Sequence, residues 1–564
     1  MAITSTPRVD VTSPDDDPVG PTTSPDRSFL RWGIAAHLVG VVVLAAAIVV
    51  WLGGTLVYVL DDAAIHLAMA DRPAHDGTWG VVPGQFQSAS SSPLWTVLTA
   101  AGVAVAGPAA PWVPLVLNAA AGVGVVAVLA AGQSIIRPGR ARPLDVVATV
   151  VLVTVVLFLP GLAVVGMEHT VHVALVLAAV LGVHRWVLDR PGWSPAWTYL
   201  AVAVASLARF ETAFVAVGLA VALVLADRRR FTGRAVGVLA ASAVPIAGFA
   251  LVNRALGAGW MPNSLLAKGQ GPGQLQDDAT TPIAIVQRAA ADPVVVVLLA
   301  LAAVYLIMRG RRAPAVLPAV TLLVAAAAHM TLADVGWYER YQAYLVAIGV
   351  YLVLAVLAEL PETVLRRAVV AVCTVGLVAG VPKLYALESA PRAADDMYRQ
   401  QYTAGRFLER FYEGEPVATD QLGYISLFHD GPLTDFAGLG DYEVLLRRDD
   451  PGPTRDLRTD LTDERGFRVA VLYDIAAAFN APRTWIEVGS WRIDGEPVSG
   501  VSDELVFFAT SPDEVGPLQD HLAAFESDLP ARSTLHLAEG AGLRAMALDL
   551  EAREDAEPGA DTQG

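Results

Sequence analysis

Long apolar blocks separated by short polar turns fill most of the chain before residue 387. A membrane-spanning helix needs about 20 consecutive apolar residues. Runs that reach or approach this length predict about eleven spanning helices, at 32–59, 112–132, 145–162, 170–187, 195–208, 211–226, 235–252, 293–308, 314–331, 341–358 and 366–385. The predicted fold class is therefore an α-helical polytopic membrane protein.

A further apolar run, 94–107, is short and has Pro93 before it and Pro108 after it. These features favour an interfacial or re-entrant helix within a first outer loop at 60–111. Leaving this run out of the spans, with the N-terminus inside, places fourteen basic residues in inner loops and six in outer loops. The positive-inside rule thus predicts a multi-pass plasma-membrane protein with a cytoplasmic N-terminus and an extracytoplasmic C-terminal part.

The polar segments complete the expected domain organisation. Residues 1–30, rich in Pro, Ser, Thr and Asp, predict a disordered cytoplasmic tail. Residues 31–386 form the transmembrane domain, and 387–548 an extracytoplasmic soluble domain. The latter has mixed charge and short apolar runs at 468–473 and 505–509, which predict strands and an α/β fold. The acidic stretch 549–564 is expected to be disordered.

Composition argues against a soluble enzyme, a disordered scaffold and a nucleic-acid-binding protein. Of the 564 residues 54% are hydrophobic and only 17% charged, whereas soluble proteins carry about 25% charged residues. The net charge of −17 argues against a nucleic-acid partner. The single cysteine, Cys373, cannot form an internal disulfide.

Ionisable side chains at helix ends in a membrane are costly unless they are used, so they are the first candidates for chemistry. Asp61 and Asp62 follow the first span, and one of them could take a proton from an attacking hydroxyl. Equally, both could be solvated charges that only mark the membrane boundary. The pair could hold a divalent cation, but no spacing in the chain matches a tight metal site, so no metal ligands are predicted.

Paired charges recur at other outer turns. Glu168 and His169 lie between two spans, with His169 interpreted as a packing residue or as a support for a ligand-binding residue rather than as a ligand itself. Arg209 and Glu211 interrupt the stretch 195–226, and because an unpaired arginine there would be costly we interpret them as a structural pair.

The outer loop 253–292 contains Lys268, the first lysine of the chain. Together with Arg209 and Arg340, its ammonium group could neutralise a lipid-linked phosphate. Taken singly, Lys268 could also be an interfacial lysine that reaches the headgroups.

Six motifs at outer helix ends resemble those of the GT-C superfamily of polytopic glycosyltransferases, and most of all the actinobacterial arabinofuranosyltransferases that cap cell-wall arabinan, including the terminal β-(1→2) type. A similar segment follows the last span, at 417–424 and 433–439. The motifs are Asp61-Asp62-Ala-x-Ile, Ser92-Pro-Leu-Trp95, Gly166-Met-Glu168, Leu207-Ala-Arg209-Phe-Glu211, Pro262-Asn263-Ser-x-x-Ala267-Lys268 and Arg340-Tyr341.

This resemblance implies a GT-C-like enzyme that transfers a sugar, with inversion, from a polyprenyl-phosphate donor to a cell-envelope glycan acceptor such as arabinogalactan. Asp61 or Asp62 would be the general base. The sugar would be arabinofuranose, with a mannosyl or other donor as the alternative, because His66 and Phe210 depart from the usual pattern. The residues implied to bind donor phosphate or substrate are His66, Glu168, His169, Arg209, Glu211, Asn263, Lys268, Arg340 and Tyr341.

Two other classes of function remain open at this point. A lipid or glycan transporter would place ionisable residues near the middle of the bilayer rather than at outer helix ends. A surface assembly protein would depend on its outer domain. In the glycosyltransferase reading this domain would bind the acceptor, with Trp485, Trp491 and Tyr424 able to stack on sugars, although such aromatic residues more commonly pack in a core.

Overall fold

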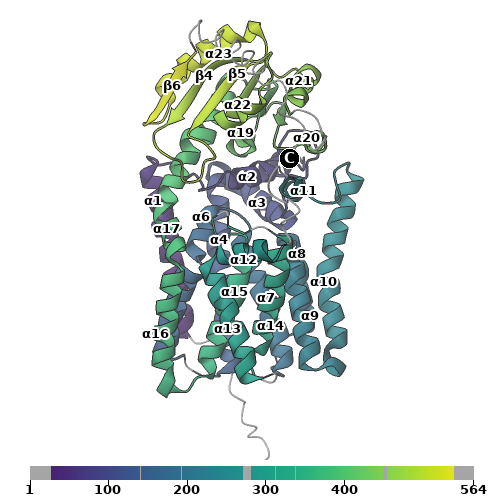
Figure 1. Ribbon diagram of the computed structural model, residues 1–564, viewed down its shortest axis with the longest axis vertical. Coiled ribbons are helices and arrows are strands. Elements are labelled where there is room, and N and C mark those ends of the chain that lie inside the picture. The colour runs from purple at the N-terminus through teal and green to yellow at the C-terminus, as the bar shows by residue number, and fades with distance from the viewer. Residues whose placement is uncertain are drawn as a thin grey trace, which may run out of the picture.

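The computed structural model describes residues 27–538 except 140, 192, 271–280, 311–312, 334, 337 and 449–453. A bundle of apolar helices forms one part of the molecule, and a sheet with helices around it forms the other (Figure 1). Helix α1 begins at Arg27, so residues 27–30 belong to a helix and not to the expected tail. The rest of that tail, and the acidic stretch 549–564, lie outside the described residues.

Helices lie at all eleven of the predicted ranges. Within the described residues, five helical stretches are long and apolar enough to cross a membrane, or up to seven if the bent pairs α12–α13 and α16–α17 each count as one span. Helices α8, α9, α14 and α15 are shorter apolar helices. The bundle contains α1 (Arg27–Trp51), α4 (Val113–Ile136), α5 (Pro143–Val151), the π-helix η2 (Leu152–Val156), α6 (Leu159–Val165), α7 (His169–Val187), α8 (Pro195–Ala208), α9 (Thr212–Ala226), α10 (Arg228–Ala255), α13 (Pro293–Arg309), α14 (Val316–Leu332), α15 (Ala343–Glu359) and α16 (Glu362–Ala379). The chain is a multi-pass membrane protein.

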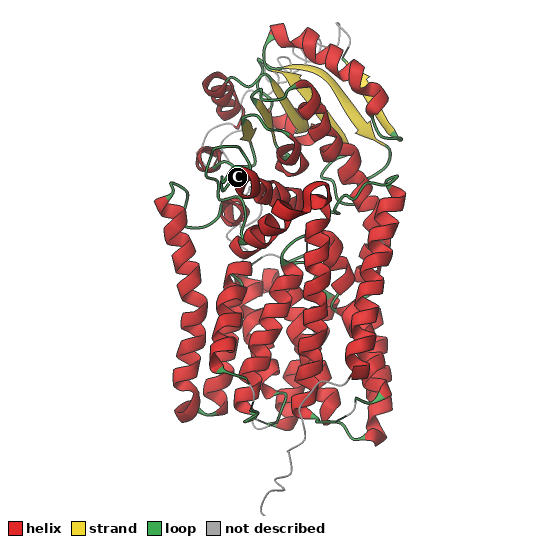
Figure 2. Ribbon diagram, turned by 180° about the vertical axis from the view of Figure 1, so that it is seen from behind, coloured by secondary structure: helices red, strands yellow, loops and turns green. Residues whose placement is uncertain are grey.

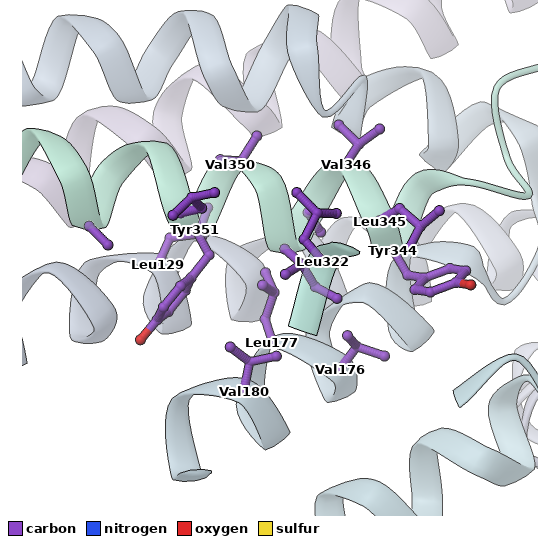
Figure 3. Packing of buried hydrophobic residues seen from close by; sticks show 14 of the residues in the cluster. Leu129, Val176, Leu177, Val180, Leu322, Tyr344, Leu345, Val346, Val350 and Tyr351 are labelled. Carbon is purple, nitrogen blue, oxygen red and sulfur yellow. The ribbon is translucent and has the colours of Figure 1, made fainter. Parts of the chain in front are cut away.

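Helix α15 lies at the centre of the bundle. Fifteen of its seventeen residues are buried, as expected for a helix that is apolar on every side. Figure 3 shows its Leu345 and Val346 among Leu322 of α14 and Leu177 of α7. This rigid core fixes the positions of the turns at both ends of the surrounding helices.

A layer of short helices separates the bundle from the sheet (Figure 1). It includes α2 (Asp62–His75) and α3 (Pro93–Ala106), and α3 coincides with the predicted interfacial helix. The 3-10 turn η1 (Gly107–Trp112) joins α3 to α4. Two further short helices follow α10: α11 (Asn263–Gln270) and α12 (Pro282–Ala290).

Helix α17 (Val381–Met397) carries the chain away from the bundle and runs across the expected domain boundary at 386–387 without a break. In the part of the chain that the structure describes, all strands lie beyond it, in a six-stranded sheet with the order β2-β1-β3-β5-β4-β6, at the end of the molecule seen at the top of Figure 2. Strands β1 (Val417–Thr419), β2 (Leu433–Asp435) and β3 (Val469–Tyr473) are parallel, whereas β4 (Ile486–Ile493), β5 (Glu504–Ala509) and β6 (Ser533–Leu537) pair antiparallel. The apolar runs 468–473 and 505–509 are thus strands, as predicted.

Both faces of this sheet are buried. Val471 of β3 belongs to one hydrophobic cluster and Leu472 to another, because successive side chains point to opposite faces. The helices of this region are the π-helix η4 (Tyr398–Tyr402), α18 (Thr403–Phe411), α19 (Leu422–Phe428), α20 (Tyr442–Arg448), α21 (Thr454–Arg465), α22 (Asp474–Asn480), α23 (Pro512–Phe525) and the 3-10 turn η5 (Glu526–Asp528). The region is an α/β domain.

The idea that Trp485, Trp491 and Tyr424 stack on sugars is wrong. Each side chain is buried in a core, with Trp491 packed on Phe507 at a ring-centroid distance of 4.4 Å. The hydroxyl of Tyr424 accepts a hydrogen bond from the backbone N–H of Tyr58 at 2.9 Å. The two tryptophans stabilise the domain, and Tyr424 stabilises its contact with the bundle.

Candidate active site

A cavity of about 380 Å³ lies where the bundle meets the α/β domain. One wall comes from α2, the turns that end the bundle helices and α11, and the other comes from the α/β domain. The charged residues that line it are Asp61, Asp62, Arg209, Arg340 and Arg448; His66, Tyr341, Gln401, Gln421 and Tyr473 are among its other polar residues. The cavity therefore gathers side chains from segments far apart in the sequence.

Asp61 and Asp62 stand at the start of α2 but have different partners. Nη2 of Arg340 donates a hydrogen bond to Oδ2 of Asp62 at 2.7 Å. Among the described residues no cation pairs directly with Asp61. Burial and then the Asp62 carboxylate raise the pKa of Asp61 to about 7, against the opposing effect of Arg340. Asp61 can therefore both hold and release a proton near neutral pH.

Arg340 is almost fully buried at the cavity wall. Besides Asp62, its guanidinium group contacts the Met167 sulfur at 2.8 Å and the Tyr341 hydroxyl at 3.1 Å. Its Nε has no acceptor among the described residues. A buried donor without an acceptor is costly. Arg340 thus places its positive charge at the cavity wall.

A second arginine, Arg209, is held by two carboxylates. It donates to Glu168 at 2.6 Å and to Glu211 at 2.5 Å, which confirms that Arg209 and Glu211 form a pair at the helix break. His169 contacts the same guanidinium group at 3.2 Å. The two carboxylates fix this charge at the cavity wall.

His66 lies on the other side of Glu168. Its Nε2 is 3.5 Å from Oε2 of Glu168, and its Nδ1 is 3.3 Å from the Ser90 hydroxyl. Burial lowers the pKa of His66, although Glu168 opposes the shift. His66 is therefore a neutral, hydrogen-bonding member of the site.

Of the residues around α11, Ser264 and Ala267 line the cavity, and Asn263 is not one of its lining residues. The backbone N–H of Asn263 donates to the Ser88 carbonyl at 2.9 Å, while its buried side-chain amide has no partner in the described part of the chain. Lys268 belongs to α11, but its side chain falls outside the described residues.

The polar residues of the α/β domain in this cavity did not emerge as candidates from the sequence. Gln401, on η4, donates to Gln421 at 2.8 Å, and its buried Oε1 has no donor in the region that the structure describes. The resembling segment at 417–424 contains Gln421 and could have indicated it. Gln401 and Arg448 carry no such signal, because they reach the cavity only through the fold.

Within the described ranges, no three His, Cys, Asp or Glu side chains cluster closely enough to hold a metal ion. The second carboxylate of the pair, Asp62, contacts an arginine instead. The arrangement can bind an anion beside a carboxylate that accepts a proton.

The fold of the chain is similar to that of a protein of known structure. ArnT from Cupriavidus metallidurans, solved bound to undecaprenyl phosphate, is 13% identical, with a TM-score of 0.52 over 86% of this chain and 99% of that chain. Its apo state gives the same score at 14% identity. The chain therefore has the fold of ArnT. This agrees with the resemblance at the level of the fold.

Other comparisons add less. The arabinofuranosyltransferase AftD from mycobacteria is 17% identical over 87% of this chain and 42% of that chain. Its TM-score of 0.44 is too low to support a conclusion about the fold. Residues 393–509 match a family described as a domain of unknown function, DUF8728. A comparison with curated protein sequences finds no match.

Proposed function

We propose that the chain is a membrane glycosyltransferase that moves a sugar from a polyprenyl-phosphate donor to a glycan acceptor. The observation that carries this proposal is the cavity in which Asp61, with a pKa of about 7, lies beside Arg340 and Arg209 at the end of an apolar bundle. A phosphosugar head could enter this cavity while its polyprenyl tail stays in the bilayer. The fold shared with ArnT supports the same reading.

The proposed reaction is a single inverting displacement. The acceptor hydroxyl oxygen attacks the anomeric carbon while its proton passes to the Asp61 carboxylate. The bond between the anomeric carbon and the phosphate oxygen breaks, and its electron pair stays on the polyprenyl phosphate. We assign the base to Asp61 because its pKa suits proton transfer near neutral pH, whereas Asp62 is engaged by Arg340.

Arg340 and Arg209 would stabilise the negative charge that develops on the leaving phosphate. Two described guanidinium groups face four carboxylates in this cluster, so a donor phosphate needs further cations. We propose Arg448, which lines the cavity, and Lys268, which directly follows the lining residue Ala267. The carboxylates paired with these arginines are Asp62, Glu168 and Glu211.

We further propose that the sugar is arabinofuranose, that the acceptor is a cell-envelope glycan, and that the α/β domain lies outside the cytoplasm. The resembling motifs around Asp61, Arg209 and Lys268 support the donor class, and the excess of basic residues in the opposite loops supports the orientation. ArnT was solved with undecaprenyl phosphate, a lipid of the polyprenyl-phosphate class. A mannosyl or other polyprenyl-phosphate sugar is the alternative donor.

The test is sugar transfer by the purified protein in lipid, with a panel of polyprenyl-phosphate sugars and both Asp61→Asn and Asp62→Asn. We expect transfer from the arabinofuranosyl donor, lowered at least about 100-fold in Asp61→Asn. Transfer from a mannosyl donor alone would overturn the sugar but keep the reaction. Full activity of Asp61→Asn would overturn the assignment of the base.

A further inference from the structure

Two neighbouring arginines lie near the start of α16, at the end of the bundle farthest from the sheet (Figure 1). Arg366 and Arg367 border an open groove of about 520 Å³, lined by exposed side chains along one face of α16. Apart from Thr374, the rest of its lining is apolar: Val370, Ala371 and Val375. The groove thus has a cationic end and an apolar end.

Among the described residues, these two arginines have no carboxylate in contact with them. Both are exposed, and neither has an ion-pair partner in the described part of the chain. Four other arginines at this end of the bundle are compensated by carboxylates: Arg137 by Glu362, Arg142 by Asp145, Arg230 by Asp189 and Arg309 by Glu359. Two uncompensated guanidinium groups side by side favour an external anion.

A cavity of about 190 Å³ continues from this groove along α16. The groove and the cavity share Ala371 and Val375. Only aliphatic side chains and Gly376 line the cavity, which is bounded by η2, α13, α15 and α16. Water is poorly accommodated in such an apolar space, whereas a hydrocarbon chain fits it.

We propose that this surface binds an anionic phospholipid of the leaflet opposite the sheet. Its phosphate group lies between Arg366 and Arg367, and one acyl chain follows α16 from the groove into the cavity against α13. The charge of the two arginines selects an anionic lipid over a zwitterionic one, and the groove selects a lipid over a soluble anion. This site is remote from the cavity at Asp61, and the inference does not rest on the transferase activity.

Native mass spectrometry of the full chain released from detergent measures this directly. Phosphatidylglycerol and phosphatidylcholine with identical dioleoyl chains are the two probes. An interfacial arginine contributes roughly a fivefold preference for anionic lipid. We therefore expect the wild type to retain phosphatidylglycerol at least about fivefold better, and Arg366→Gln with Arg367→Gln to lose that preference.

The matched control is Arg228→Gln with Arg229→Gln, an exposed arginine pair that starts α10 and lines no described cavity. It should keep the preference. Ala371→Trp, which fills the shared part of the groove, should lower retention of phosphatidylglycerol without lowering the thermal unfolding temperature. Equal retention of both lipids, equal losses in both arginine pairs, or displacement of the lipid by glycerol phosphate would each overturn the proposal.

Discussion

Adjacent carboxylates at the start of α2 acquire different properties from their surroundings. Asp62 is tied to Arg340, which lies 278 residues further along the chain. Asp61 has no such cation, and burial together with its charged neighbour holds its pKa near 7. One residue can therefore orient a phosphate-binding arginine while the next accepts a proton.

This difference gives opposite effects of Asp61→Asn on activity and on stability. Loss of a general base is expected to lower the transfer rate by about 10²- to 10⁴-fold. Because the folded state holds the Asp61 proton more tightly than the unfolded state, wild-type stability falls as pH rises from about 4 to about 7. The amide cannot ionise, so the variant should unfold at a higher temperature than wild type at pH 8.

Activity of the wild type should correspondingly rise with pH through about 7 and then level off, as Asp61 loses its proton. Initial rates between pH 5 and 9 and thermal unfolding at pH 5 and pH 8 measure the two effects. Asp62→Asn serves as the comparison, since it should weaken donor binding through Arg340 and, by removing the neighbouring charge that raises the Asp61 pKa, move the pH profile to lower pH. An unchanged pH profile in an active Asp61→Asn protein would contradict the assignment.

At the scale of single residues, the sequence alone indicated most of the ionisable residues that line the cavity. The cost of burying charge in a membrane makes Asp61, Arg209 and Arg340 visible as candidates. The sequence could not show which of Asp61 and Asp62 is the base, because the contact between Asp62 and Arg340 joins segments that are distant in the chain. For Trp491 the sequence left sugar stacking and core packing open, and the structure shows core packing, because the folded sheet brings Trp491 against Phe507.

Between elements, the close approach of α19 to the start of α2 depends on Gly423. A Cβ atom at this position would lie 2.7 Å from Cβ and 2.9 Å from the carbonyl oxygen of Asp61. Backbone cannot give way cheaply at that distance, so Gly423→Ala should push α19 from α2 and displace the proposed base. We expect at least a tenfold loss of transfer.

The measurement pairs kcat with a thermal unfolding curve, so that a shifted site is distinguished from an unfolded domain. Gly516→Ala, in α23, is the control, because a Cβ there meets no atom within 4 Å. It should leave kcat unchanged and, in a helix, stabilise slightly. Equal kcat values for the two variants would show that the contact at Gly423 does not position Asp61.

A buried ion cluster joins the turn that carries Arg340 to α13 and α17. Nζ of Lys383 lies 3.2 Å from Asp292 and 2.7 Å from Glu339. Lys383→Met leaves two buried carboxylates without their cation, which should cost about 3–5 kcal/mol. The same change should shift Glu339 and so misplace the adjacent Arg340.

Chemical or thermal unfolding and the KM for the donor measure these two consequences. Adding Glu339→Gln and Asp292→Asn to Lys383→Met removes the uncompensated charge and should recover part of the stability, but not the donor KM. Recovery of both would mean that the cluster stabilises the fold without orienting Arg340. If Lys383→Met changed neither the stability nor the KM for the donor, the proposed role of the ion cluster would be contradicted.

Periodicity and apolar length predicted the helices well, including the break at Arg209 and the separate helix α3. They did not predict the π-helix η2 inside the third apolar run, because packing and not composition selects it. They also placed a domain boundary at 386–387, where charge begins to rise. Helix α17 continues through it, since its residues pack first on α1 and then beneath the sheet.

Across the whole molecule, the α/β domain is part of the cavity and not a separate appendage. One hydrophobic cluster contains Ile65 and Met69 of α2 together with Phe407 and Val469 of the domain. From the sequence, only the distribution of basic residues between the loops predicted on which side of the membrane this domain lies. Its contribution of Gln401 and Gln421 to the cavity needed the tertiary structure.

This arrangement predicts that the two halves of the chain bind different substrates. Gln401 and Gln421 face Asp61 from the domain side, and each amide can bind a sugar hydroxyl, so Gln401→Ala or Gln421→Ala should raise the KM for the acceptor. Loss of one or two such hydrogen bonds corresponds to roughly 5- to 30-fold. The KM for the donor should change little.

Arg340→Gln provides the opposite case, because it should raise the KM for the donor and leave acceptor binding nearly intact. Steady-state kinetics with each substrate varied in turn separates these effects in the full chain. If the glutamine variants changed the donor KM as strongly as Arg340→Gln does, the α/β domain would be a cover for the donor. If they changed neither KM, the acceptor would enter elsewhere, and the shared cavity would serve the donor and the base alone.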